Sequence, residues 1–201
     1  MKNKALFLGL TLLLVFSFMG CPEQKKEEKT FSDGLTEINV LWEKNNVDSS
    51  YLVSNNSSIE FSVSDLEALN TDLINYQESL DDFKQDEEVQ ALKDFTEIHL
   101  LLVDELVLAL EVKEVNDGMA SEEINGDNLC SFKQDLKFVA ENTIELNEKM
   151  KKVNDLVYAF NEVHPGLVEE ANLTGFIADT TSFSQTELDF EIVLEELERL
   201  C

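Results

Sequence analysis

Apolar side chains recur at steps of three and four residues along one long stretch of this chain. Between residues 132 and 160 these positions, one of them a threonine, are Phe132, Leu136, Val139, Thr143, Leu146, Met150, Val153, Val157 and Phe160. Residues at this spacing share one face of an α-helix, because the helix repeats about every 3.6 residues. The stretch therefore predicts a long amphipathic helix whose apolar face packs against other helices.

Two segments earlier in the chain show the same pattern. One runs from Leu66 to Phe83, and Ser64 followed by Glu67 predicts a capping box at its start. The other runs from about Glu87 to Val115 and is apolar on nearly all sides between Ile98 and Leu110. A helix of this kind is expected in the centre of the protein.

The last residues predict a further helix, from about Gln185 to Leu200. Ser184 and Glu187 suit a capping box at its start. Its predicted buried stripe consists of Phe190, Val193, Leu194, Leu197 and Cys201.

Two shorter helical segments complete the predicted fold. One follows Ser32 and contains residues 35–42, and the other spans residues 167–173, after Pro165 and Gly166 have ended the long helix. We therefore predict an all-α fold, an antiparallel bundle of four main helices with an additional short N-terminal helix packed on its side. A single helical-bundle domain would span residues 31–201.

The first 21 residues predict that the protein is exported. Lys2 and Lys4 precede an apolar run over residues 5–19, which is typical of a signal peptide and short for a membrane span. Phe18-Met19-Gly20-Cys21 resembles the lipobox of prokaryotic membrane lipoproteins, with Phe18 and Met19 in place of the more usual leucine and small residue. The resemblance covers this segment alone. It implies cleavage after residue 20 and acylation of the Cys21 thiol. An uncleaved anchor helix and an ordinary signal peptide are the alternatives, and both also export the domain.

Residues 21–30 predict a disordered, charged tether, because the stretch from Pro22 to Thr30 has no aliphatic or aromatic side chain. The chain from Cys21 onward keeps 13 of the 15 basic residues and all 42 acidic ones, so its formal charge is 13 minus 42, or −29. Nucleic-acid binding needs a basic surface to neutralise phosphates, so this class of function is excluded. A basic protein partner is compatible with the charge.

Cys130 and Cys201 are the other cysteines of the chain. An exported protein with two further cysteines favours a disulfide between them, and two buried free thiols are the alternative. Ser131 and Gln134 suit a capping box, which places Cys130 just before the long helix, while Cys201 follows the last helix. If these two helices are antiparallel, the two cysteines meet.

Acidic side chains gather in three places. Two are connections between helices, with Asp81, Asp82, Asp86, Glu87 and Glu88 in the first and Asp117, Glu122, Glu123 and Asp127 in the second. Neither has the order of an EF-hand loop, and acidic caps at helix starts explain the first. The third is a stripe along the last helix, formed by Glu187, Glu191, Glu195 and Glu198. It predicts either a solvated face or a surface that docks a basic partner.

Catalytic and cofactor motifs are missing from the sequence. His99 and His164 are its two histidines, and neither has a glutamate three residues before it, as a di-iron bundle needs. We find no zinc, haem, phosphate-loop or serine-nucleophile motif. We therefore expect a protein that is not an enzyme and has no metal and no cofactor.

The predicted function is that of a membrane-anchored extracytoplasmic lipoprotein, a non-catalytic interaction or structural module of the cell envelope. The alternative is an extracytoplasmic binding protein for a small solute or cation, which needs a polar pocket between helices. An enzyme is the third hypothesis, and it would need carboxylates and His99 to face one cleft.

Overall fold

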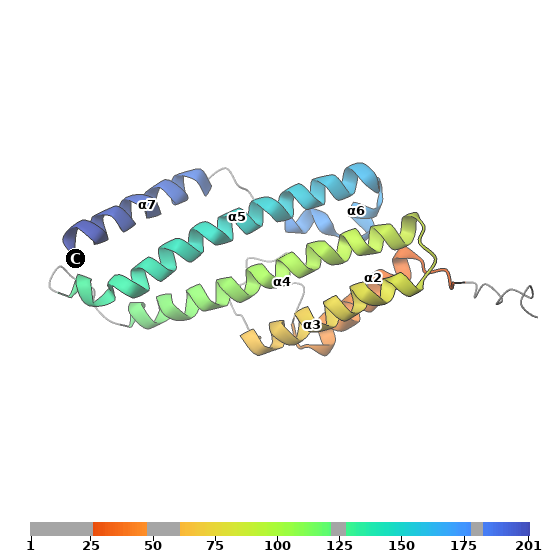
Figure 1. The fold of residues 1–201 in the computed structure, drawn as a ribbon, viewed down its shortest axis with the longest axis horizontal. Helices are drawn as coiled ribbons and strands as arrows, with labels where there is room; N and C mark the ends of the chain where they lie inside the picture. Colours follow the sequence, from red (N-terminus) through yellow and green to blue (C-terminus); the bar gives the residue numbers. More distant parts are fainter. Residues whose placement is uncertain (1–25, 48–60, 122–127, 178–182) are drawn as a thin grey trace, which may run out of the picture.

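The computed structural model describes residues 26–47, 61–121, 128–177 and 183–201. The predicted signal peptide and Cys21 therefore lie outside the described residues. Within the described ranges the chain forms helices and no strands (Figure 1). The predicted all-α bundle is confirmed.

In the described residues, five long helices form the body of the protein, together with three short 3-10 turns and one short helix. The long helices are α2 (Phe31–Lys44), α3 (Val63–Ser79), α4 (Glu87–Ala120), α5 (Lys133–Val163) and α7 (Phe183–Leu200). The short elements are η2 (Leu80–Asp82), η3 (Leu129–Phe132), α6 (Leu167–Glu170) and η4 (Leu173–Phe176).

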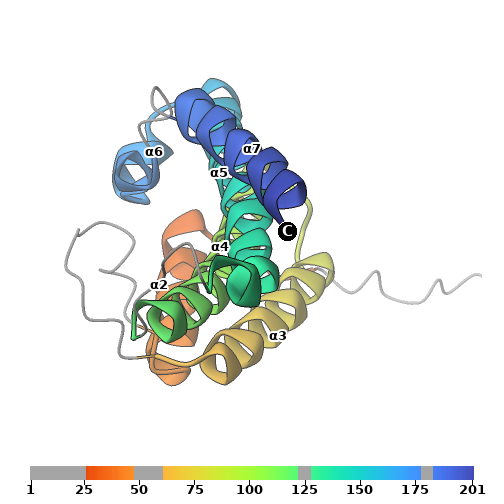
Figure 2. The same cartoon turned by 90° about the vertical axis from the view of Figure 1, so that its left-hand side faces the viewer.

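Helices α4 and α5 run antiparallel along the whole length of the molecule (Figure 1). Their direction is fixed by two contacts, the ion pair of Lys149 with Asp104 and the contact of His164 with Asp94 at 2.9 Å. Helices α2 and α3 pack against the first half of α4, whereas α7 packs against the first half of α5 (Figures 1 and 2). As predicted, the apolar α4 is central, because it contacts α2, α3 and α5.

The first and last helices differ in how they contribute to the core. The additional N-terminal helix α2 is present, and its inner face buries Phe31, Ile38 and Trp42, which are at most 2% exposed. In α7, Leu197 is buried, but Val193, which was predicted to face the core, is 40% exposed. Among the long helices in the described residues, the extensive contacts of α7 are with α5, so α7 lies along the outside of the bundle.

The three predicted capping boxes, which begin at Ser64, Ser131 and Ser184, are wrong. Helix α3 is capped by Ser62 and Asp65 and not by the pair that begins at Ser64. Both pairs fit the pattern, and the earlier start places Phe61 and Leu66 at the positions of a hydrophobic staple, where both are buried. Helix α5 follows the turn η3, in which the Ser131 hydroxyl donates to the carbonyl oxygen of Asn128.

Helices α2 and α7 also begin earlier than expected. Thr30 caps α2, so Ser32 lies inside the helix. Helix α7 begins at Phe183, so Ser184 is likewise a helical residue and not a cap.

Gly34 of α2 lies where this helix meets α3 and α4. A Cβ atom added there would lie 2.2 Å from Leu92 Cδ2 and 2.6 Å from the Tyr76 hydroxyl oxygen. Leu92 is fully buried, and a packed core gives its side chain little room to move. We therefore expect Gly34→Ala to lower the free energy of unfolding by about 1–3 kcal/mol, although alanine normally favours a helix.

Gly118→Ala in α4 is the matched control for this substitution. Nothing lies within 4 Å of the added Cβ at this position, so the intrinsic preference for alanine is expected to raise the stability by up to about 1 kcal/mol. Urea unfolding measures both variants. Equal stability of the two variants would contradict the close contact at Gly34.

Candidate functional site

Residues 26–30, the second half of the predicted tether, are bound to the turn between α3 and α4. Lys26 Nζ donates to the carbonyl oxygen of Asp81 at 2.6 Å, and the backbone N–H of Lys84 donates to the carbonyl oxygen of Glu27 at 3.0 Å. Lys84 Nζ also lies 3.0 Å from the carboxylate of Glu28. The prediction of a disordered tether is therefore wrong for residues 26–30. The polar residues that led to this prediction bind the bundle.

Lys29 is the most enclosed charge of this segment. Its side chain is 8% exposed, and its Nζ lies 2.6 Å from Glu37 Oε2 and 4.7 Å from the centre of the Phe83 ring. An ammonium group over an aromatic face is attracted by the ring quadrupole. The carboxylate and the ring together hold Lys29 against the protein.

The next two residues continue this segment into the core. The Thr30 hydroxyl accepts from the N–H of Asp33 at 3.1 Å and so caps α2. The N–H of Phe31 donates to Glu88 Oε2 at 2.6 Å, and the Phe31 ring packs 5.6 Å from the ring of Phe95. The N-terminal segment is thus fixed to both α2 and α4.

The acidic turn between α3 and α4 is occupied by the protein's own groups. Lys93 Nζ lies 2.5 Å from Asp81, and its hydrogen bond holds the pKa of Asp81 below the ordinary value. Asp86 accepts from the N–H of Val89 and caps α4. In the second acidic connection, Asp117 pairs with Lys113, and residues 122–127 lie outside the described residues.

The acidic stripe of α7 lies beside the lysines of α5. Glu187 is 2.6 Å from Lys151 Nζ, and Glu198 is 3.2 Å from Lys133 Nζ. Glu191 and Glu195 are exposed. The two ends of the stripe therefore take part in the contact between α7 and α5.

A disulfide fixes the C-terminal end of α7. Cys130 and Cys201 are joined, with an S–S distance of 2.01 Å and a Cα–Cα distance of 5.5 Å. This is the pairing expected from the sequence. Beside it, a groove of about 370 Å³ runs between Lys137 of α5 and Leu194 of α7.

His99 lies in an aromatic part of the core. Its side chain is 3% exposed, and its Nδ1 accepts from Trp42 Nε1 at 3.0 Å. Burial lowers the pKa of His99 to about 3, so the ring is neutral at physiological pH. Its Nε2 has no hydrogen-bond partner among the described residues, and the ring packs against Phe95 and Phe176. This arrangement is that of a core histidine and not of a catalytic base.

His164 lies at a second groove, at the end of the molecule where residues 26–30 are bound. The groove has a volume of about 640 Å³ and is lined by Phe31, Glu88, His164 and Leu167, among others. His164 ends α5, as expected, and its Nε2 is 2.9 Å from Asp94 Oδ2. Glu88 already accepts from the backbone of Phe31. Two polar groups of the groove are therefore bound within the protein.

Glu105 is a functional candidate that the sequence interpretation missed. It lies in the apolar part of α4, where burial raises its pKa to about 7 and nearby Lys149 opposes this shift. The signal for it was visible, since a carboxylate that interrupts an apolar helix must be partly buried when that helix is central. A partly buried carboxyl with a pKa raised to about 7 predicts that stability depends on pH near neutrality.

The pH dependence of stability tests this property. Because the pKa of Glu105 is higher in the folded than in the unfolded protein, its contribution is favourable at low pH. It is lost as the pH rises from about 4.5 to about 7. Raising the pH from 5 to 8 should therefore destabilise the wild type relative to Glu105→Gln by about 2 kcal/mol. Urea unfolding of both proteins at the two pH values measures this, and a constant difference would contradict the raised pKa.

Comparison with known proteins assigns no family to this fold. No family model, curated protein or solved structure matches this chain. Among the described helices none is both long and apolar enough to cross a membrane. In the same residues, no group of three or more histidine, cysteine, aspartate or glutamate side chains is placed to hold a metal ion. Function must therefore be inferred from the residues themselves.

Proposed function

We propose that this protein is a membrane-anchored extracytoplasmic lipoprotein, held on its membrane by an acylated Cys21. Its helical bundle acts as a non-catalytic interaction or structural module of the cell envelope. The lipid bilayer is the first partner, and the strongly negative charge favours a basic protein as the second.

The disulfide is the structural observation that carries this proposal. Disulfides such as Cys130–Cys201 persist in oxidising compartments outside the cytoplasm and are rare inside it. This supports the export that Lys2, Lys4 and the following apolar run predict. The described bundle begins at residue 26, so Cys21 precedes it by a short segment.

The core supports a role without catalysis. His99 is held by Trp42 in an apolar environment that keeps it neutral, and it has no adjacent carboxylate among the contacts described above. A general base needs access to its substrate and a pKa near the working pH. The enzyme hypothesis of the sequence therefore gains no support from His99.

The solute-binding alternative has one feature in its favour, the groove beside His164. Its volume of about 640 Å³ lies in the range of ligand pockets. Glu88 and His164, however, are already bound to Phe31 and Asp94, so a ligand would have to compete for them. This favours the interaction module over the binding protein.

Membrane fractionation of two cysteine variants tests the anchor. We expect Cys21→Ala to carry no acyl group and to be lost from the membrane fraction, because the Cys21 thiol is the group that accepts the lipid. Cys130→Ala removes a different cysteine and should remain acylated. Equal acylation of the two variants, or an absence of acyl groups on the wild type, would contradict the proposal.

A further inference from the structure

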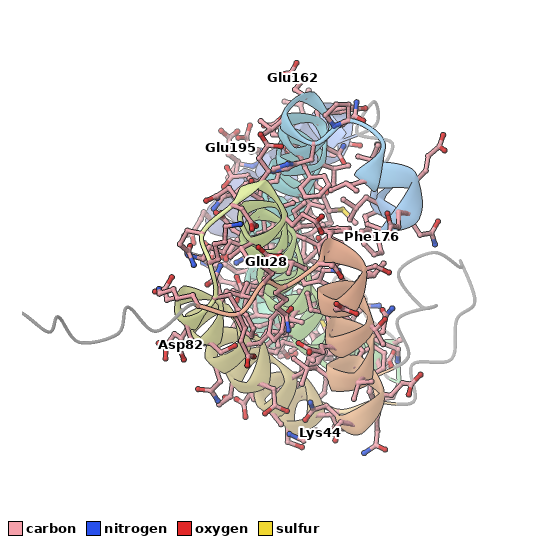
Figure 3. The ribbon with its side chains drawn as sticks, turned by 90° about the vertical axis from the view of Figure 1, so that its right-hand side faces the viewer. Glu28, Lys44, Asp82, Glu162, Phe176 and Glu195 are labelled. Carbon is pink, nitrogen blue, oxygen red and sulfur yellow. A yellow bond between two sulfur atoms is a disulfide. The ribbon has the colours of Figure 1, made fainter. Side chains whose placement is uncertain are left out.

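Residues 26–31 connect the chain to one end of the bundle, and this fixes where an anchored protein can lie. Lys26 is bound to Asp81 and the backbone of Glu27 to Lys84, so the chain is attached to the turn between α3 and α4. Figure 3, which looks onto this end, shows Glu28 near the middle of the view, between Asp82 and Phe176. The chain therefore reaches the bundle through an end face and not through its flank.

Only a short segment separates this attachment from Cys21. A chain extends by at most about 3.6 Å per residue, so the five residue steps from Cys21 to Lys26 span no more than about 18 Å. If Cys21 is acylated, as proposed above, the α3–α4 turn must lie within about this distance of the lipid.

We propose that the bundle stands on its membrane with this end toward the bilayer. The membrane-facing end consists of the α3–α4 turn, the start of α2 and the connection between α5 and α6 (Figure 1). The opposite end, with the Cys130–Cys201 disulfide and the last residues of α4 and α7, faces away. This orientation rests on the proposed lipid anchor.

Charge keeps the membrane-facing end from lying on an anionic bilayer. Asp82, Glu87, Glu162 and Glu170 are exposed at or near this end. The lysines described at this end are engaged. Lys29 pairs with Glu37, Lys93 pairs with Asp81, and Lys26 and Lys84 bind Asp81, Glu27 and Glu28. Repulsion from anionic headgroups therefore keeps the described residues of this end off the bilayer, and the short chain holds the protein there.

The length of α4 determines how far the opposite end of the bundle lies from the bilayer. Its 34 residues rise by about 1.5 Å each, so the helix is about 51 Å long. A bundle that stands upright thus presents the disulfide end and the exposed part of the α7 stripe far from the lipid. A protein partner would meet the molecule there.

Energy transfer to labelled lipid tests the orientation. The acylated protein is reconstituted into vesicles that contain an anionic lipid and a headgroup-linked acceptor dye. A donor dye is attached to Asp82→Cys at the membrane-facing end or to Asn116→Cys near the opposite end, both at exposed positions. We expect strong transfer from position 82 and weak transfer from position 116.

Two controls make the outcomes distinguishable. Flotation with the vesicles tests the anchor itself, and protein that does not float contradicts the anchor and the orientation together. Floating protein with equal transfer from both sites, or with stronger transfer from position 116, overturns the orientation alone. Insertion of a ten-residue Gly/Ser segment after Gln24 should reduce transfer from position 82 without changing flotation, because it lengthens the short chain that holds the protein there.

Discussion

Trp42→Ala is expected to lower the free energy of unfolding by about 3–5 kcal/mol. The Trp42 side chain is 1% exposed, and its indole N–H donates to His99 Nδ1. The substitution creates a cavity between α2 and α4 and leaves a second nitrogen of the buried His99 ring without a partner, which adds a desolvation cost. Urea unfolding followed by circular dichroism measures the effect without relying on tryptophan fluorescence.

Val40→Ala provides the control on the same helix. Val40 is 53% exposed, so its truncation should change the stability by about 0.5 kcal/mol or less. Trp42→Phe keeps most of the volume and removes the N–H, so it isolates the hydrogen bond. If Trp42→Ala and Val40→Ala have similar stabilities, α2 is not part of the core and the described packing is wrong.

Removing the disulfide has the second large expected effect. The bond closes a loop with a sequence separation of 71, and in the chain-entropy model such a loop stabilises the fold by about 4 kcal/mol. A variant with both Cys130→Ser and Cys201→Ser should lose about this much. Helix α7 should lose the most protection from hydrogen exchange. Among its described residues Leu197 is the one that is buried, so its own packing holds it weakly.

Hydrogen exchange with mass spectrometry locates this loss. We expect faster exchange in α7 of the double variant, whereas α2, α3 and the first half of α4 keep the protection of the wild type. The reduced wild-type protein serves as a chemical control and should behave in the same way. Uniform loss of protection across all helices would show that the bond supports the whole fold and not α7 alone.

Periodicity in the sequence was enough to predict which segments are helical. It also identified α4 as central, because residues 98–110 are apolar on nearly all sides and only a helix surrounded by others can bury such a surface. It could not show which of the two helices, α2 or α7, contributes more to the core. Both are amphipathic, but α2 contributes the large side chains of Phe31 and Trp42 to the core, while α7 packs mainly against α5 in the described residues.

The sequence pattern of a helix cap failed to predict the start of α3, because two serines fit the pattern equally well. Ser62 and Ser64 each precede an acidic residue by three positions, and the packing of Phe61 and Leu66 decides between them. The tether prediction failed for a related reason. From the sequence alone, Lys26 is expected to be solvated. The carbonyl oxygen of Asp81 that accepts its hydrogen bond is distant in the sequence, and the fold brings the two together.

The central claim is a lipid-anchored bundle in an oxidising compartment, and one measurement tests both parts. The native protein is extracted from membranes and its intact mass is determined with thiol alkylation, before and after reduction. We predict the mass of a chain that begins at Cys21 and carries acyl groups, with two alkyl groups added only after reduction. An unacylated chain, or alkylation of Cys130 and Cys201 without reduction, would contradict the account.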